Sequence, residues 1–158
     1  MAWLRLDPAT AARERDGSGP RDGVVSHRSA CLVHGLGEFP SPRTELTVRQ
    51  RLSTREPSVL LHIRTAALDR GDVVTVDGLP VTTAERTIID LLHAGVDAGQ
   101  VGAVLVPADR RGMVDLDALA ARATPFAARY AMRGASGTDL LAALAEEAGQ
   151  RLGTGAER

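Results

Sequence analysis

The sequence predicts an α+β fold, in which a small mixed or antiparallel sheet of about four short strands is packed by an N-terminal helix and a C-terminal set of helices. Three observations support this. An apolar helical segment covers about 27–35, short β-like runs follow between 45 and 81, and helical patterns fill most of the chain beyond. Strands grouped in one part of a sequence and helices in another are typical of α+β proteins.

The length and loop signals predict one domain with flanking segments. The chain has 158 residues, which suffices for a hydrophobic core. Residues 13–23 (RERDGSGPRDG) are rich in glycine and charge and indicate a loop. We therefore assign 1–23 to a junction and flexible loop, 24–149 to a single domain, and 150–158 to a frayed tail.

The composition excludes several classes of protein. The formal net charge is −1, so no global basic excess draws the chain to nucleic acid. The single cysteine, Cys31, excludes an internal disulfide and fits a reducing cytoplasm. There is no signal-peptide pattern and no apolar run of the ~18 residues that a membrane span needs. The expected location is cytoplasmic, without membrane association.

The first helix is expected over about 27–35. Ser26 is a good N-cap, and Ser29 falls in the first turn. Gly35 and Gly37 can supply the left-handed ending. Apolar residues surround these polar ones, so the helix should be well buried.

Three short segments then predict the sheet. Residues 45–49 (ELTVR) alternate, and 59–63 (VLLHI) form a nearly continuous apolar run that predicts a strand covered on both faces. Residues 73–76 (VVTV) lead into Asp77-Gly78, a tight-turn signal, and then into 79–81. This last part should be a hairpin.

The later helices are predicted from caps and breakers. Thr82-x-x-Glu85 forms a capping box, and Pro107 should stop the second of these helices. The expected ranges are about 83–94, 97–107, 116–123 and 138–149. Asp115 or Asp117 can cap the helix over 116–123, and Ser136 or Thr138 can cap the helix over 138–149.

A metal site is conceivable at the first helix. His27, Cys31 and His34 recur at i, i+4 and i+7 and fall roughly on one helical face. Only three candidates cluster locally, and the next histidine, His62, lies well downstream. We favour a buried cysteine flanked by hydrogen-bonding histidines and expect no metal.

Enzyme chemistry is not expected either. Ser26, Ser29 and His27 suggest a hydrolase, but capping explains Ser26, the G-x-S-x-G elbow is absent, and no acidic third member lies nearby. Nuclease cores of the restriction type need a lysine after paired carboxylates, and the chain has none. There is no P-loop and no dinucleotide fingerprint. We therefore expect no catalytic residue and no cofactor.

A second polar group lies in the helix over 83–94. Arg86 and Asp90 stand at i, i+4, a spacing that usually gives a modest surface pair. Here Ile88 and Leu91 are among the apolar neighbours, so a partly buried pair is expected. With Thr87, it should tie the helix to a strand or to the first helix, since buried polar groups must find partners.

An ordered series of runs gives the sequence a family resemblance. The runs are Val25–Ala30, His34–Leu36, Leu46–Val48, a strand with His62, Gly78–Thr83, Glu85–Thr87 and Asp90–Leu91. In this order they resemble the AbiEi-type antitoxin family over nearly the whole chain. The signature positions that this resemblance marks are Ser26, His27, Arg28, Ser29, His34, Arg86, Thr87 and Asp90.

The resemblance implies a non-catalytic antitoxin domain of a type IV toxin–antitoxin pair, which counteracts a nucleotidyltransferase-like toxin without requiring a stable complex. Such proteins usually begin with a winged helix-turn-helix that binds promoter DNA. This sequence starts where that domain would end, so residues 1–6 are expected to belong to the junction. The alternative is a DNA-associated transcriptional regulator that lacks or is separated from its winged domain. In either case the two halves of the signature should touch in the fold.

Overall fold

The protein has the expected α+β architecture, with one mixed sheet of five short strands, rather than about four, and five α-helices among the described residues. The structure is a computed structural model that describes residues 23–40, 43–48, 57–63 and 68–153. Most of the assigned junction and loop, and the last five residues of the tail, lie outside these ranges.

The sheet has the strand order β3-β2-β1-β5-β4. β1 pairs antiparallel with β2 and parallel with β5, β2 and β3 are parallel, and β4 and β5 form the expected antiparallel hairpin. The extra strand is β1, which has two residues and therefore too little length to show a period. The bounds are β1 Val24–Val25, β2 Thr44–Val48, β3 Val59–Ile63, β4 Val73–Val76 and β5 Leu79–Thr82.

The expectation that 59–63 is covered on both faces was wrong. β3 is an edge strand, and Ile63 is 48% exposed. Leu61 packs against the small core beneath the first helix, whereas Leu60 lines a surface hollow. A continuous apolar run shows that both sets of side chains are apolar, but it does not show that both faces are covered.

The first two helices begin and end near the predicted positions. α1 (His27–His34) ends at Gly35, which has the left-handed conformation with φ of 64°. α2 (Ala84–Ala94) begins one residue later than predicted, because Thr83 and not Thr82 accepts the capping bond from the Arg86 N–H. Thr82 instead closes β5.

Pro107 does not stop the third helix. α3 (Ala98–Arg110) continues for three residues beyond it. A proline removes one N–H donor, so in the last turn it costs only one intrahelical bond. Asp115 caps α4 (Leu116–Ala123), a 3-10 helix η3 (Thr124–Tyr130) follows, and Ser136 caps α5 (Gly137–Glu147) in a capping box.

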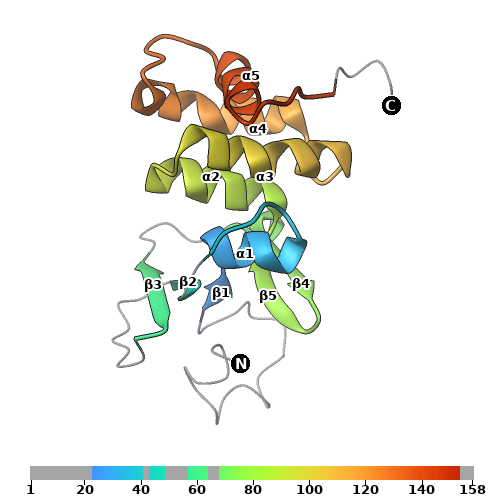
Figure 1. Ribbon diagram of the computed structural model, residues 1–158. Coiled ribbons are helices and arrows are strands. Elements are labelled where there is room, and N and C mark those ends of the chain that lie inside the picture. The colour runs from blue at the N-terminus through green and yellow to red at the C-terminus, as the bar shows by residue number, and fades with distance from the viewer. Residues whose placement is uncertain (1–22, 41–42, 49–56, 64–67, 154–158) are drawn as a thin grey trace.

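The elements stack in layers, as Figure 1 shows. α1 lies between the sheet and the pair α2 and α3, and α4 and α5 lie beyond that pair. A small core joins Ala30 of α1 to Val25, Leu46 and Val81 of the sheet. The larger core lies among the helices and also takes in Cys31 from α1. α1 is therefore buried from two sides, which places its polar residues inside the molecule.

Within the residues that the structure describes, no helix combines the length and the apolar character needed to cross a bilayer.

Candidate functional site

Arg86 is the centre of a buried ion-pair cluster. Its Nε donates to Asp90 Oδ1 at 3.0 Å, and its Nη1 donates to Asp72 Oδ2 at 2.6 Å. Arg122 of α4 donates from Nη2 to Asp72 Oδ1 at 2.9 Å. The buried Arg86–Asp90 pair expected from the sequence is confirmed. The expected partner element was wrong for Arg86, which among the described residues bonds neither a strand nor the first helix but Asp72, at the end of the short 3-10 helix η2 (Arg70–Asp72).

The charges in this cluster hold one another in the ionised state. Burial alone would raise the pKa of Asp72, but hydrogen bonds from Arg86 and Arg122 bring it below its ordinary value. Burial would lower the pKa of Arg86, but Asp90 and Asp72 reverse that effect and raise it. The cluster ties α2 to α4 and η2.

The two halves of the signature meet between α1 and β5. His34 donates from Nε2 to the carbonyl of Thr82 at 2.7 Å. The hydroxyls of Thr82 and Thr87 lie 2.7 Å apart and share a hydrogen bond. Arg111, which follows α3, donates to the carbonyl of His34 at 2.8 Å. The predicted contact between the two halves is confirmed, and His34 and Thr87 are both part of it.

The set His27, Cys31 and His34 is not brought together as a ligand group. His34 is bonded to β5, whereas the imidazole of His27 lies against His62. Cys31 is fully buried. Burial raises the pKa of its thiol to about 12, with a further contribution from Glu45. Cys31 is part of the larger hydrophobic core.

Ser26 occupies the N-cap position of α1, but it makes no side-chain cap bond, so this part of the prediction was wrong. Its Oγ accepts a hydrogen bond from Thr47 Oγ1 at 2.8 Å and lies 2.9 Å from Nδ1 of His27. Ser29, also buried, accepts from the backbone N–H of Glu45 at 2.8 Å. Both serines therefore fasten α1 to β2, because a buried hydroxyl bonds whichever partner the fold places nearest.

His27 has an unusual backbone. Its φ is 53°, in the left-handed region, which costs roughly 1–2 kcal/mol for a residue with a Cβ. The strained residue is the link between β1 and the rest of α1. The rings of His27 and His62 stack with centroids 3.6 Å apart and 14° between their planes. Strain of this kind persists only where the surrounding structure enforces it, and it is frequent at functional sites.

His62 and Glu45 come to the same place from neighbouring strands. His62 lies directly opposite Thr47, so Glu45, two residues before Thr47, is on the same face. Nε2 of His62 is 2.8 Å from Oε2 of Glu45, a carboxylate that is only 3% exposed. Arg28 approaches the other carboxylate oxygen at 3.7 Å. One nitrogen of each histidine and one oxygen of Glu45 all lie within 4.8 Å of one another.

Sequence reasoning missed this meeting of His27, Glu45 and His62, and it missed Asp72 as a partner of Arg86. A weak signal was present. Glu45 and Thr47 are polar residues alternating with apolar ones on a strand, and the structure buries both. The alternation alone would place them on a solvated face. Only the parallel pairing of β2 with β3 places His62 beside Glu45.

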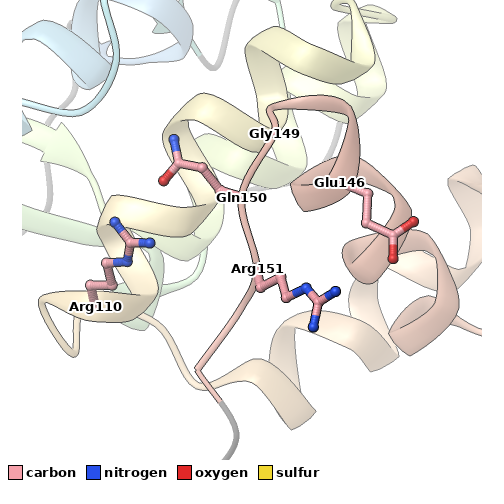
Figure 2. A pocket seen from close by; sticks show the side chains of 5 residues that line it. All are labelled: Arg110, Glu146, Gly149, Gln150 and Arg151. Carbon is pink, nitrogen blue, oxygen red and sulfur yellow. The ribbon is translucent and has the colours of Figure 1, made fainter.

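Two surface hollows differ in their relation to these residues. One, of about 480 Å³, is lined by Arg110, Glu146, Gly149, Gln150 and Arg151. In Figure 2 its charged side chains spread apart and do not converge on one point. The other, of about 250 Å³, has Glu45 in its wall together with Arg28, Phe39, Pro40, Arg43, Leu60 and Gln100. Only the second adjoins the group formed by His27, Glu45 and His62.

Comparison of the chain with protein-family models gave no match, and comparison with curated protein sequences gave none either.

Proposed function

We propose that this chain is a non-catalytic antitoxin-type domain of a type IV toxin–antitoxin pair that counteracts a nucleotidyltransferase-like toxin in the cytoplasm. The proposal starts from the resemblance of the sequence to AbiEi-type antitoxins. The contacts that the signature residues make within the fold support the proposal. These residues come from two distant parts of the chain, and two of them, His34 and Thr87, join those parts through Thr82.

The observation that supports a non-catalytic function most directly is the burial of the polar signature groups. Ser26, Thr87 and Asp90 are fully buried, and Arg86 is 7% exposed. Each has hydrogen-bond partners inside the protein. An enzyme presents its reacting groups to a substrate, within hydrogen-bond reach of it. Groups engaged in this way hold elements of the fold together instead: Ser26 bonds β2, Thr87 bonds β5, and Arg86 bonds Asp90 within α2 and Asp72 of η2.

Co-expression tests the proposal. The chain would be induced in cells that carry the neighbouring nucleotidyltransferase-like gene, and colony counts would be compared with and without induction. The expected result is rescue of growth. A matched control is Glu147→Ala, which changes an exposed residue at the end of α5 and should rescue equally. Absence of rescue while folded protein accumulates would refute the antitoxin function.

A gel shift on the promoter of the chain's own operon distinguishes the antitoxin from the alternative, a DNA-associated transcriptional regulator. Binding through phosphate contacts is strongest at low salt and weakens steeply as salt rises. A shift with that dependence, without rescue of growth, would identify a DNA-associated regulator. The antitoxin proposal predicts rescue whether or not the promoter is bound.

A further inference from the structure

We propose that His27, Glu45 and His62 bind one divalent first-row transition-metal ion, for which Zn²⁺ is the representative. The inference goes beyond the proposed function, for which the resemblance implies no cofactor. It rests on the meeting of three ligands, two imidazoles and one carboxylate, from three separate elements, α1, β2 and β3; His27 and Glu45 are buried and His62 is half-buried.

The distances suit a shared ion after an adjustment of the side chains. Zn²⁺ binds histidine nitrogen and carboxylate oxygen at about 2.0–2.2 Å, so tetrahedral ligands lie roughly 3.3 Å from one another. Here the ligand atoms are at most 4.8 Å apart, and the closest pair, His62 Nε2 and Glu45 Oε2, is at 2.8 Å. To bind one ion, the two stacked imidazole rings must turn out of their parallel arrangement so that both nitrogen lone pairs point at it, and the farthest ligand atoms must approach by about 1.5 Å.

Neighbouring groups orient the ligands. Nδ1 of His27 faces Ser26 Oγ, which also accepts from Thr47, so we assign Nε2 as the coordinating nitrogen. A second ring nitrogen held by a hydrogen bond is the usual support of a metal-bound histidine. Oε1 of Glu45 is the oxygen nearer Arg28, which leaves Oε2 for the ion.

The ligand types select the class of metal. Two imidazoles and one carboxylate match Zn²⁺ and its neighbours such as Co²⁺, whereas Mg²⁺ and Ca²⁺ prefer oxygen alone. Three protein ligands leave a fourth position for water. On binding, the ion replaces the hydrogen bond between His62 and Glu45. Nε2 of His62 gives up the proton that it shares with Glu45: from a ring protonated on both nitrogens this proton passes to solvent, and from a neutral ring it moves to Nδ1, so that the bound ring carries one proton, on Nδ1.

The backbone of His27 and the surface beside Glu45 give two further reasons to place a metal ion here. Three non-glycine residues have positive φ in the described part of the chain: His27 at the start of α1, Asp77 in the β4–β5 turn and Ala131 at the end of η3. At His27 the strained residue coincides with the ligand group, a pattern that points to function. Glu45 also lines the hollow of about 250 Å³, and the side chain of His62 is 25% exposed, so the group lies close to the surface.

Titration calorimetry of the EDTA-treated chain with ZnCl₂ tests the proposal. One ion per chain is expected. His62→Ala should weaken binding by at least ~100-fold, since even a change in a residue that only orients a ligand costs about 10–100-fold. His93→Ala is the matched control, because His93 is an exposed histidine on α2, and it should bind as the wild type does. MgCl₂ should give no heat of site binding.

Three results would overturn the site. These are no saturable Zn²⁺ binding by the wild-type chain, equal affinity in His62→Ala, and an equal loss in His93→Ala. Glu45→Gln preserves the shape of the side chain, so it tests the site even where His62→Ala fails to fold. Zn²⁺ should raise the Tm of the wild type and of His93→Ala, because a ligand stabilises the state that binds it, but it should not raise that of Glu45→Gln. The same rise in all three would contradict the proposal.

Discussion

Replacing Asp90 with alanine tests whether the buried ion pairs hold the helical layers together. Asp90 is fully buried and accepts a hydrogen bond from Arg86 Nε at 3.0 Å. Its removal leaves a buried guanidinium with one fewer partner, and breaking a buried pair in this way typically costs about 3–5 kcal/mol. Arg86 retains Asp72, so the lower end, about 3 kcal/mol, is expected.

That loss is large enough to measure by thermal unfolding. For a chain of this size, 1 kcal/mol corresponds to roughly 2–4 °C, so Asp90→Ala should lower the Tm by about 6–12 °C. Circular dichroism at pH 7 gives the Tm, and urea titration gives the free energy of unfolding. Asp90→Asn keeps the volume and one acceptor oxygen, so its loss should be smaller. Glu147→Ala, at an exposed position, should change the Tm little.

An unchanged Tm in Asp90→Ala would refute the reasoning, because it would mean that Arg86 is equally stable with one partner. An equal loss in Asp90→Asn and Asp90→Ala would also be informative. It would assign the effect to charge alone and not to the packing of the carboxylate among the core residues of α2.

Three further predictions concern packing, the thiol and acid stability. Gly102→Ala should destabilise by ~1–3 kcal/mol or more in urea unfolding, because its Cβ would lie 1.9 Å from the carbonyl oxygen of Leu144, whereas Gly99→Ala, whose nearest contact is 3.3 Å, should cost far less. Cys31 should resist a thiol reagent at pH 8 in the native chain and react fully in denaturant, because burial raises its pKa to about 12; rapid native labelling would contradict this. The pKa of Asp72 is lowered by the net effect of its two arginines, so its stabilisation is present above the unfolded pKa of about 4 and is lost as the pH falls through the lower folded value. Asp72→Asn should therefore be less stable at pH 7, with a deficit that closes in acid; a constant deficit from pH 7 to pH 2 would be evidence against this.

Local signals in the sequence were sufficient for the elements that depend on local chemistry. The Asp77-Gly78 turn has positive φ at both residues, as a two-residue hairpin requires. Of the two candidates that the sequence left open for each cap, Asp115 and Ser136 make the side-chain bonds. In each case the interaction that defines the structure lies within a few residues of the chain.

The same local signals gave the wrong result where a residue distant in the sequence determines which hydrogen bond a side chain makes. Ser26 has the right residue type for a cap, but Thr47 and His27 take its hydroxyl. Thr82 likewise has the right type for a capping box, but its hydroxyl pairs with Thr87 and the cap moves to Thr83. A hydroxyl that could serve locally bonds elsewhere when the fold buries it beside a second polar group. No period or spacing in the sequence contains that information.

The two buried polar groups of this fold therefore differ in what they leave to be explained. In the Arg86 cluster each carboxylate oxygen of Asp72 faces one guanidinium, so the opposite charges offset the free-energy cost of burying one another. The group of His27, Glu45 and His62 has features that its charges alone do not explain. It combines a strained residue, two stacked imidazoles and a carboxylate beside a surface hollow. Glu45 has His62 at 2.8 Å and Arg28 at 3.7 Å as partners. The proposed ion is a partner that all three side chains share.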